Sequence, residues 1–337
     1  MTMLTEHRVQ QVLRGFDGKR IAVVGDLMLD RYYWGTVRRI SPEAPVPVVE
    51  VDSESVRLGG AANVASNIQT LGGEAIMVGL IGDDHPGQQF ISLLRERGFD
   101  SSSVLVDSAR PTTTKTRVIA HAQHVVRIDN ESKLDSPEHL RTKMIAALRD
   151  AIGTLDGIII EDYNKGVVTP DLIRQIIALA RDNHIPVAVD PKFNNFFEYK
   201  HVTVFKPNRR EAEEVLGWKL VTLDDVVRAG KKLLEMLEAE HILLTRGEEG
   251  MSLFAAGGGI THLPTVAANV RDVSGAGDTV IATLTIALAA GADIQESCVL
   301  ANCAGGVVVG SVGIVPIQRN ELLEAVVRSI NHSTPRV

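Results

Sequence analysis

The sequence predicts an α/β fold in which a doubly wound, mainly parallel sheet is flanked by helices. Two observations support this fold class. Short apolar runs alternate with stretches of helical periodicity along most of the chain. The runs are apolar throughout rather than at every second residue, which is typical of strands that are buried on both faces. Strands and helices that alternate in this way form parallel sheets with helices on both sides.

The individual elements follow in order from these patterns. Apolar runs predict strands at residues 21–26, 75–81, 157–160, 186–189, 202–205 and 241–245. Helical patterns predict helices at residues 61–71, 87–97, 137–152, 170–182, 210–216, 223–238 and 276–290. The helix at 210–216 has a clear start signal, because Asn208 is a good N-cap and Glu211 completes a capping-box spacing.

Two stretches break the alternation. Residues 31–52 contain three consecutive aromatic residues and several prolines, which indicates exposed β structure with protected edges. Residues 112–129 indicate a second pair of strands. We expect both stretches to be insertions that form a small β lid on a single domain spanning residues 1–337. The apolar surface of such a lid predicts a homodimer that pairs two lids.

Composition excludes several classes of protein. The formal charge of −7 and the pI near 5.8 argue against binding to nucleic acid or to an anionic membrane. The charged N-terminus lacks the apolar core of a signal peptide, and no apolar run predicts a membrane span. Cys298 and Cys303 suit neither a zinc motif nor a disulfide framework, which predicts buried free thiols. We therefore expect a cytoplasmic protein.

The strongest chemical signal is the segment Asp-Val-Ser-Gly-Ala-Gly-Asp-Thr at residues 272–279. Gly275 and Gly277 let the backbone approach an anion, and the helix that they open points free N–H groups at it. Asp278, in the first turn, is placed to take a proton from a bound group. A phosphate cradle beside a carboxylate indicates phosphoryl transfer to a hydroxyl group, although an ordinary glycine-rich turn has the same residues.

Polar residues that follow predicted strands should meet at one rim of the sheet. They are Asp30, Asp162, Asp190, Asn208 and Thr245. At this rim Asp30 can bridge two sugar hydroxyls, or it is simply solvated. Gly59 and Gly60 leave room for a ligand beside Asn63, or they form a tight loop before a helix.

Each charged residue near the rim either contacts a ligand or has only a structural or solvated role. Glu211 either lies near Mg²⁺, through water, or only completes the capping box. Five basic residues lie near the rim or the lid, and we expect two or three of them to bind substrate while the others are solvated. They are Lys115, Arg117, Arg127, Lys165 and Lys192.

Together these motifs resemble the ribokinase-like, PfkB-type carbohydrate kinases. The resemblance rests on Gly59-Gly60-Ala-Ala-Asn63, on Asn208-x-x-Glu211 and on residues 272–278, in that order, and it covers nearly the whole chain. It implies that Asp278 deprotonates the acceptor hydroxyl while N–H groups of Gly275, Ala276, Gly277 and Asp278 hold the phosphoryl group. It also implies that Asp30, Gly60 and Asn63 grip the sugar.

The resemblance also implies a nucleotide site and a metal. Asn208 and Glu211 would organise Mg²⁺ and the phosphates of ATP, and Thr245, Gly247 and Asn302 would line the nucleotide site. Val273-Ser274 stands where many relatives have Thr-Val, which weakens the case for a monovalent cation near Asp272.

A narrower resemblance, to the D-glycero-β-D-manno-heptose 7-phosphate kinases, concerns the substrate. It rests on the segment Arg-Ile-Ser-Pro-Glu-Ala-Pro-Val-Pro-Val at 39–48, on Asp162-Tyr-Asn-Lys165-Gly and on Asp190-Pro-Lys192. It implies that ATP phosphorylates a sugar phosphate whose phosphate contacts Lys192, Lys165 or Arg127. Because no His-x-Gly-His turn occurs, we expect a stand-alone kinase without a fused nucleotidylyltransferase.

Three alternatives remain at this point. Two of them are a kinase of ribose, fructose or a hexose phosphate and a sugar sensor without catalysis. A dinucleotide-binding oxidoreductase is a weaker alternative, because the first strand is followed by Gly-Asp-Leu-Met-Leu-Asp rather than Gly-x-Gly-x-x-Gly.

Overall fold

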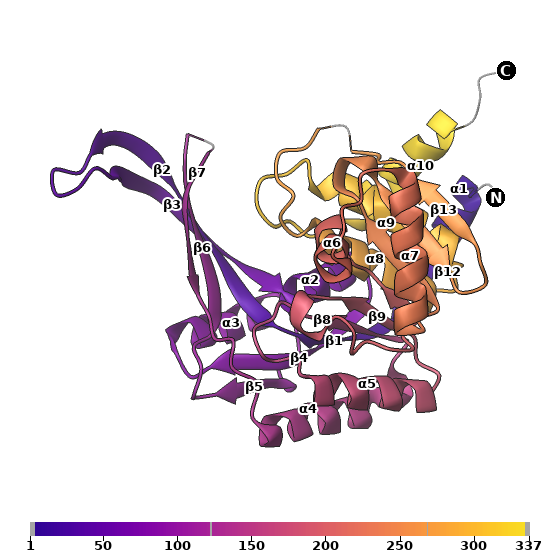
Figure 1. Cartoon of the computed structure of the whole chain (residues 1–337). Helices are drawn as coiled ribbons and strands as arrows, with labels where there is room; N and C mark the ends of the chain where they lie inside the picture. The colour runs from indigo at the N-terminus through magenta and orange to yellow at the C-terminus, as the bar shows by residue number, and fades with distance from the viewer. Residues whose placement is uncertain (1–3, 122, 268, 334–337) are drawn as a thin grey trace.

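The computed structural model describes residues 4–121, 123–267 and 269–333 (Figure 1). Its helices are α1 (Glu6–Arg14), α2 (Ala61–Leu71), α3 (His85–Glu96), α4 (Glu138–Ala151), α5 (Pro170–Asp182), α6 (Arg209–Leu216), α7 (Leu223–Leu237), α8 (Ala276–Ala289), α9 (Ile294–Val308) and α10 (Arg319–Ser333). Its strands are β1 (Arg20–Gly25), β2 (Leu27–Ile40), β3 (Pro47–Gly60), β4 (Glu74–Gly82), β5 (Val104–Asp107), β6 (Thr113–Ala120), β7 (Gln123–Asn130), β8 (Gly157–Glu161), β9 (Val187–Asp190), β10 (Val204–Phe205), β11 (His241–Thr245), β12 (Met251–Ala255) and β13 (Ile260–Leu263).

The main sheet confirms the predicted fold class. Its strand order is β13-β12-β11-β10-β9-β8-β1-β4-β5, and the pairs from β11 to β5 are parallel. All six predicted strands occur in it within two residues of their predicted ends. The sequence patterns missed β5 and the antiparallel edge strands β12 and β13. Both β5 and β13 have only four residues, too few for a clear apolar pattern.

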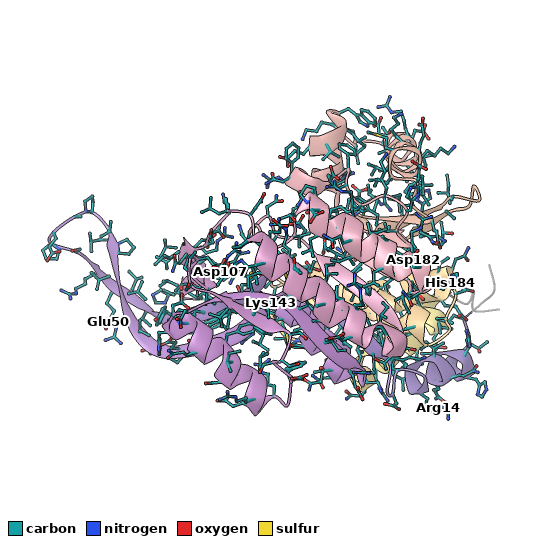
Figure 2. The ribbon with its side chains drawn as sticks, turned by 90° about the horizontal axis from the view of Figure 1, so that it is seen from below. Arg14, Glu50, Asp107, Lys143, Asp182 and His184 are labelled. Carbon is teal, nitrogen blue, oxygen red and sulfur yellow. The ribbon has the colours of Figure 1, made fainter. Side chains whose placement is uncertain are left out.

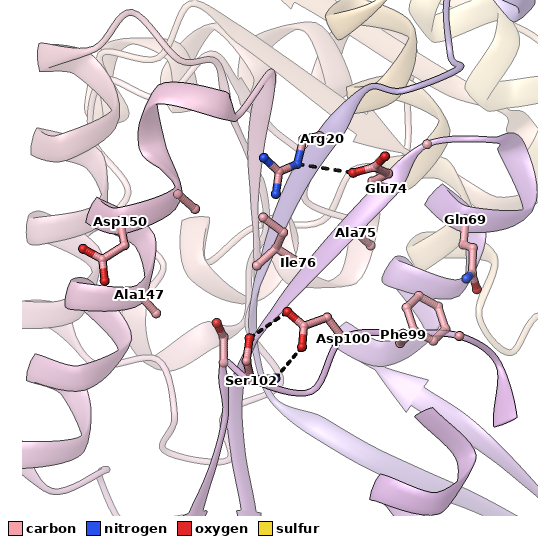
Figure 3. A pocket seen from close by; sticks show the side chains of 14 residues that line it. Arg20, Gln69, Glu74, Ala75, Ile76, Phe99, Asp100, Ser102, Ala147 and Asp150 are labelled. Atoms are coloured by element: carbon pink, nitrogen blue, oxygen red, sulfur yellow. Dashed lines mark hydrogen bonds and ion pairs between the residues drawn. The ribbon is translucent and has the colours of Figure 1, made fainter. Parts of the chain in front are cut away.

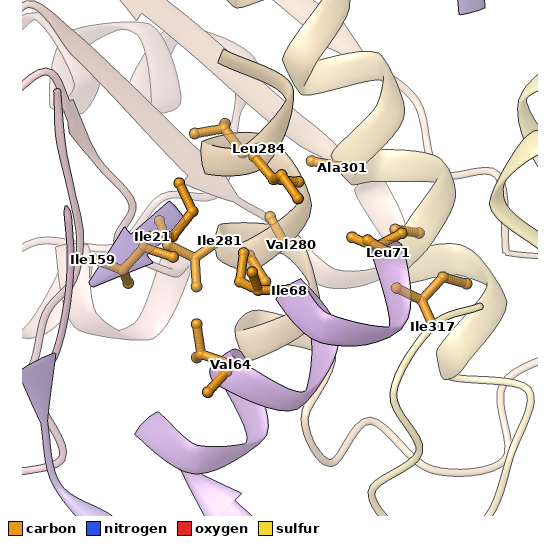
Figure 4. Packing of buried hydrophobic residues seen from close by; sticks show 14 of the residues in the cluster. Ile21, Val64, Ile68, Leu71, Ile159, Val280, Ile281, Leu284, Ala301 and Ile317 are labelled. Atoms are coloured by element: carbon orange, nitrogen blue, oxygen red, sulfur yellow. The ribbon is translucent and has the colours of Figure 1, made fainter. Parts of the chain in front are cut away.

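The sheet lies between two layers of helices. Ile21 and Val23 of β1 face one apolar cluster, to which α1, α2, α8, α9 and α10 contribute, whereas Ala22 and Val24 face a second cluster formed with α4, α5 and α7. This burial on both faces explains the continuous apolar runs in the sequence. Figure 4 shows Ile68 of α2 and Ile281 of α8 in the first of these clusters. Figure 2 shows α4 and α5 across the opposite face, with Lys143 on α4 and Asp182 at the end of α5.

A second, four-stranded sheet has the order β3-β2-β6-β7 and is called the small sheet below. β2 and β3 form a long antiparallel ribbon whose tip projects from the body, with Glu50 near the projecting end (Figures 1 and 2). Its strands extend beyond the predicted insertion at 31–52, because β2 starts at Leu27 and β3 ends at Gly60. Since β2 follows the carboxyl end of β1 directly, the base of the small sheet lies at the rim where ligands bind in such folds.

None of the helices in the described parts of the chain combines the length and the apolar character that crossing a membrane requires. Both cysteines lie in α9 and are free and buried, as the sequence predicts.

Candidate active site

Three neighbouring strands end in charged residues that face the same side of the sheet. Glu161 and Asp190 are the last residues of β8 and β9 and are paired in register, and Lys206 follows β10 directly. Their side chains continue the face on which Ile159, Ala188 and Val204 contact the α8 layer. The ammonium group of Lys206 lies 2.7 Å from Asp190 Oδ2, and all three side chains are buried.

The N-terminus of α8 meets these strand ends. Gly275 is its N-cap, with a φ of +78°, and no side chain caps the helix. A Cβ atom on Gly275 would lie 2.9 Å from Asn63 Nδ2, and one on Gly277 would lie 3.3 Å from Asp190 Oδ2 and 3.4 Å from Lys206 Nζ. Only glycine therefore leaves the backbone of this turn open toward the strand ends.

The N–H groups of this turn are only partly available to a ligand. The N–H of Ala276 donates to the carbonyl of Val273 at 3.3 Å. Within the described residues, no acceptor is found for the N–H groups of Gly275, Gly277 and Asp278. These three groups form what we call the amide cradle, an anion-binding arrangement at a helix N-terminus. The tight turn at Val273 occupies the N–H of Ala276 in this structure, and the expected contact of that N–H with a phosphoryl group stays a prediction.

Asp278 lies beside the amide cradle and is 2% exposed. Its Oδ2 accepts a hydrogen bond from Asn63 Nδ2 at 2.8 Å, and its Oδ1 accepts one from the hydroxyl of Tyr163 at 2.8 Å. Burial, supported by the negative charge of Asp190, raises the pKa of Asp278. A buried carboxylate with a raised pKa is a better proton acceptor than an ordinary surface aspartate.

Asn63 and Asp30 reach the site through the junction of the small sheet with α2. Gly59 and Gly60 end β3 and lie directly before α2, and a Cβ on Gly59 would lie 2.0 Å from Asp30 Oδ2. The structure corrects the position of Asp30, which lies within strand β2 rather than in a loop after β1. Arg117 of β6 binds its carboxylate, so Asp30 is a buried ion-paired residue and not a solvated one.

The loop after β8 positions Tyr163. Asp26 accepts N–H bonds from Tyr163, Lys165 and Val167 at 2.7, 3.2 and 3.3 Å. Burial raises the pKa of Asp26 to about 6, and the nearby carboxylate of Asp162 adds to this rise. Asp162 itself accepts hydrogen bonds from Tyr199 and Asn195, so it holds the structure together rather than facing Asp278.

Basic side chains surround the ring of Tyr163. The ammonium groups of Lys115 and Lys192 lie 4.7 and 5.1 Å from the ring centroid. Lys165 is ion-paired with Glu131 at 2.8 Å. Burial lowers the pKa of Lys115, and the positive charges of Lys165 and Arg117 add to this effect while the carboxylate of Asp30 opposes it. Arg127 is more than half exposed and binds Asp129 on its own strand, and within the described residues no hydrogen bond or ion pair joins it to this group.

Glu211 and Asn208 form the predicted capping box at the start of α6. Asn208 N–H donates to Glu211 Oε2 at 2.8 Å, and the N–H of Glu211 donates to Asn208 Oδ1 at 2.9 Å. The other oxygen, Oε1, binds Lys192 Nζ at 2.6 Å. Burial alone would lower the pKa of Lys192, but the carboxylates of Asp190 and Glu211 outweigh it and raise that pKa. The structural interpretation of Glu211 therefore holds, whatever else this residue binds.

The remaining predicted nucleotide residues lie in two places, with Thr245 and Gly247 at and after the end of β11 and Asn302 in α9. Thr245 ends β11, donates its N–H to Pro207 at 3.0 Å and bridges to Asn208. Gly247 opens the short helix η3 (Gly247–Glu249) with a φ of +62° and open space around it. Asn302 of α9 is buried and donates to the carbonyl of Pro264 at 2.8 Å.

The carboxylates of this cluster suit a metal ion, whereas the amide cradle beside them suits a phosphate. Glu161, Asp190 and Asp278 each offer one oxygen, and these oxygens lie within 4.8 Å of one another. Both oxygens of Glu161 are buried and without a hydrogen-bond partner among the described residues. Hard oxygen ligands of this kind are those that Mg²⁺ prefers. The sequence patterns did not predict three residues of this site, which are Glu161, Lys206 and Tyr163. The first two could have been found from side-chain alternation along β8 to β10, which places them on the same face as the buried residues before them.

A hollow of about 640 Å³ lies elsewhere, at the amino ends of β1 and β4 (Figure 3). Its lining includes the ion pair of Arg20 with Glu74 and the residues Phe99 and Ser102. It contains none of the predicted site residues, so its size does not indicate function.

Comparison with known proteins agrees with this geometry. A family model described as pfkB family carbohydrate kinase matches residues 19–318. The chain belongs to the pfkB family of carbohydrate kinases. It is therefore a sugar kinase, which confirms the family that the three motifs indicated and excludes the oxidoreductase.

Several curated proteins named bifunctional protein HldE are similar to this pfkB-family kinase. The protein of Pelobacter propionicus is 42% identical over 315 residues, which are 94% of this chain and 64% of that protein. The protein of Geobacter metallireducens is 44% identical over 89% of this chain and 61% of its own length. That of Helicobacter pylori strain J99 is 42% identical over 95% of this chain and 68% of its own length. The kinase thus spans 61–68% of these relatives.

Solved structures share the fold of this pfkB-family kinase. Arabidopsis thaliana ribokinase, complexed with ribose and ATP, has a TM-score of 0.71 at 19% identity and covers 92% of this chain and 99% of its own. Escherichia coli phosphofructokinase-2, in complex with fructose-6-phosphate, has a TM-score of 0.73 at 18% identity, with 93% and 99% covered. A putative ribokinase from Agrobacterium tumefaciens has a TM-score of 0.76 at 20% identity, with 93% and 99% covered. These likenesses establish a ribokinase-like fold.

Proposed function

We propose that this kinase transfers the γ-phosphoryl group of ATP to the anomeric hydroxyl of D-glycero-β-D-manno-heptose 7-phosphate. The product is the 1,7-bisphosphate, an intermediate on the way to ADP-heptose and the lipopolysaccharide core. The similarity to the HldE proteins supports a heptose phosphate as substrate. The observation that carries the reaction type is the place of Asp278, a buried carboxylate directly beside the amide cradle.

In this mechanism Asp278 takes the proton of the acceptor hydroxyl while that oxygen attacks the γ-phosphorus atom. The bond to the β-γ bridging oxygen breaks and ADP leaves. The amide cradle and Lys206 stabilise the charge on the transferring group, a task for which one backbone donor is typically worth about 10²–10³-fold in rate. Mg²⁺, when bound near the carboxylate cluster, would neutralise charge on the ATP phosphates.

We assign the remaining predicted residues to the two substrates. Asp30, Gly59, Gly60 and Asn63 would bind the sugar, because the junction that contains them leads to Asp278. The nucleotide would lie along the rim on the other side of α8, with contacts from Asn208, Glu211, Thr245, Gly247 and Asn302. A monovalent cation near Asp272 has less support, since backbone N–H groups of Ser274 and Gly313 already bind its two oxygens at 2.9 Å.

The cellular location and the assembly of the enzyme are also part of what we propose. ATP is the donor, so we place the enzyme in the cytoplasm. We also propose that the chain forms one kinase domain in which the small sheet acts as a lid over the sugar. Two copies of the chain would pair through this sheet.

A panel of acceptors tests the function. Purified protein is incubated with ATP, Mg²⁺ and either heptose 7-phosphate, ribose, fructose or fructose 6-phosphate, and ADP release is measured. We expect the heptose 7-phosphate to give the highest kcat/KM. A higher value for another sugar would assign the enzyme to that substrate, and no ADP release with any acceptor would support the sugar sensor.

Asp278→Asn tests the mechanism in the same assay. Loss of the base should lower kcat at least about 10²-fold and leave the affinity for ATP largely unchanged. ATP binding by the variant is measured by calorimetry, which also serves as a control for folding. Turnover near that of the wild type would show that Asp278 is not the base.

Lys192→Met tests the predicted contact with the substrate phosphate. The 7-phosphate has to lie away from the anomeric carbon, and Lys192, Lys165 and Arg127 are the predicted contacts. We expect the KM for the sugar phosphate to rise more than the KM for ATP. Because Lys192 binds Glu211, an equal rise in both KM values would place Lys192 at the nucleotide instead. Lys115→Met is the matched comparison, since the ammonium group of Lys115 also lies over the ring of Tyr163 but has no ion pair among the described residues.

A further inference from the structure

The segment between α9 and α10 passes beside the amide cradle. The N–H of Gly313 donates to Asp272 Oδ2 at 2.9 Å, and the other oxygen of Asp272 accepts the N–H of Ser274, also at 2.9 Å. The side chain of Ile314 borders the N-cap of α8, because a Cβ on Gly275 would lie 3.4 and 3.5 Å from its Cγ1 and Cγ2 atoms. The position of residues 313–314 therefore affects where the cradle turn lies.

Two side chains of the small sheet hold the backbone of Ile314. Its N–H donates to the hydroxyl oxygen of Tyr32 at 3.2 Å, and its carbonyl oxygen accepts a hydrogen bond from Arg57 Nη1 at 2.6 Å. Gly313 fits closely against the same side chains, since a Cβ there would lie 3.0 Å from Arg57 Nη1 and 3.2 Å from the ring of Tyr32. Tyr32 is fully buried, so this contact belongs to the interior of the protein.

These side chains share a face of the small sheet with Asp30, the residue proposed to bind the sugar. Asp30 is paired with Arg57 across β2 and β3, and Tyr32 is paired with Arg117 across β2 and β6. Paired residues point to one face, and so do residues two apart in a strand. Arg117 binds Asp30, and the guanidinium groups of Arg57 and Arg117 lie 5.1 and 5.3 Å from the centroid of the Tyr32 ring. Contacts therefore run without a break from the proposed sugar site through Tyr32 to the amide cradle.

The segment between α9 and α10 has a separate attachment to α2. The N–H of Ile317 donates to Asn67 Oδ1 at 3.0 Å, and the hydroxyl of Thr70 donates to the carbonyl of Ile317 at 2.7 Å. Arg57 has no ion pair within the described residues, and its guanidinium group binds the carbonyl of Ile314. The contacts from the small sheet are thus additional to an existing attachment, and they act on the two residues that border the cradle.

We propose that Tyr32 and Arg57 are positioning residues that align the amide cradle by holding Ile314. The inference deepens the proposed function, because it rests on a sugar bound at Asp30 and on a phosphoryl group held by the cradle. The acceptor and the cradle lie on different elements, so their alignment depends on the contacts that join these elements. A displacement of about 1 Å at a reacting centre costs up to about 10²-fold in rate.

Tyr32→Phe tests the inference with the acceptor that gives the highest kcat/KM. The substitution removes the oxygen that accepts from Ile314 and keeps the ring beside the guanidinium groups. We expect kcat to fall at least about tenfold while the KM values for ATP and for the sugar stay nearly unchanged, since binding remains and alignment is lost. Arg57→Lys keeps a donor for the carbonyl and should retain more of kcat than Arg57→Met.

Thr70→Val is the matched control on the same segment. It removes the hydrogen bond to the carbonyl of Ile317, so it should lower the melting temperature and leave kcat near that of the wild type. The inference is overturned if Tyr32→Phe keeps the kcat of the wild type, if its effect lies only in the KM for the sugar, or if Thr70→Val lowers kcat by the same factor.

Hydrogen exchange measures the position of the cradle turn without substrates. The N–H groups of Ser274 and Ala276 are hydrogen-bonded within this turn. We expect them to exchange faster in Tyr32→Phe than in the wild type, and unchanged in Thr70→Val. Equal exchange in Tyr32→Phe and the wild type would also overturn the inference. If the wild type phosphorylates no sugar, the proposed function fails, and hydrogen exchange then decides the inference by itself.

Discussion

Asp278 receives hydrogen bonds from two residues that the fold brings from distant segments, Asn63 of α2 and Tyr163 of the β8–α5 loop. Each donor stabilises the ionised carboxylate, while burial opposes ionisation and prevails, so the pKa is raised. This balance keeps one carboxylate oriented and basic at the position where a hydroxyl group would react. The glycines beside Asp278 contribute no side chain, and this leaves space for the phosphoryl group.

Gly277→Ala separates the role of that space from the stability of the fold. Gly277 lies in α8, where alanine is better than glycine by up to about 1 kcal/mol. The new methyl group would lie 3.3 Å from Asp190 and 3.4 Å from Lys206, at the entrance to the amide cradle. We expect an unchanged or higher melting temperature together with a fall in kcat of at least about 10²-fold.

Thermal unfolding and steady-state kinetics measure both effects. Gly153→Ala is the matched control, because a Cβ there has no heavy atom within 4 Å, and it should alter neither quantity. Wild-type turnover in Gly277→Ala would show that the cradle does not hold the transferring group.

At the scale of elements, the site depends on how loops are fastened to strand ends. Asp26, which follows β1, accepts three backbone N–H groups from the loop after β8 and so fixes the segment that carries Tyr163. The capping box of α6 fastens the segment after β10 in a similar way. Local hydrogen bonds of this kind hold functional side chains more rigidly than an unsupported loop would.

The pKa of Asp26 predicts a pH dependence of stability. Its folded value of about 6 exceeds the ordinary 3.8, so between these values the folded state binds the additional proton. The contribution of Asp26 to stability is therefore highest below about pH 4 and falls as the pH rises to about 6. A shift of this size corresponds to a loss of up to about 3 kcal/mol.

Denaturant unfolding of the wild type and of Asp26→Asn, measured across this pH range, isolates the effect from other titrating groups. The variant lacks one acceptor and should be less stable at low pH, and the difference between the two proteins should shrink as the pH rises. A difference that stays constant with pH would contradict the raised pKa.

At the scale of the whole molecule, the small sheet exposes several apolar side chains. Val126 and Ile128 of β7 are 47% and 57% exposed, and they alternate with Arg127 and Asp129 on the other face. The projecting ribbon adds Ile40, Val46 and Val51, each more than half exposed. Apolar surface of this extent on a projecting sheet favours pairing with another copy.

Ile128→Asp tests the proposed homodimer. We expect the wild type to be a dimer by light scattering coupled to gel filtration, and the variant to dissociate at concentrations where the wild type does not. Val221→Asp is a matched control, because Val221 is 78% exposed and lies in the segment between α6 and α7, which is not part of the small sheet. A monomeric wild type, or dissociation in both variants alike, would contradict pairing through the small sheet.

Local patterns in the sequence were sufficient for much of the fold and for part of the site. The strands buried on both faces, the capping box of Asn208 with Glu211 and the glycine-opened start of α8 are encoded within a few residues, so the sequence alone predicts them. The small sheet was predicted only in outline, since the ends of β2 and β3 depend on pairing along their whole length.

The carboxylate cluster was decided by the tertiary structure. Glu161, Asp190 and Asp278 lie far apart in the sequence, and they meet only because β8 pairs with β9 and α8 covers that face of the sheet. Whether Glu161 faces Asp278 or the opposite layer depends on the alternation of side chains along β8, which strand pairing sets. The sequence thus determined the family, the phosphate-binding turn and the acid beside it. The fold decided which other charges surround that acid, because strand order and side-chain alternation, rather than proximity along the chain, set the distances between them.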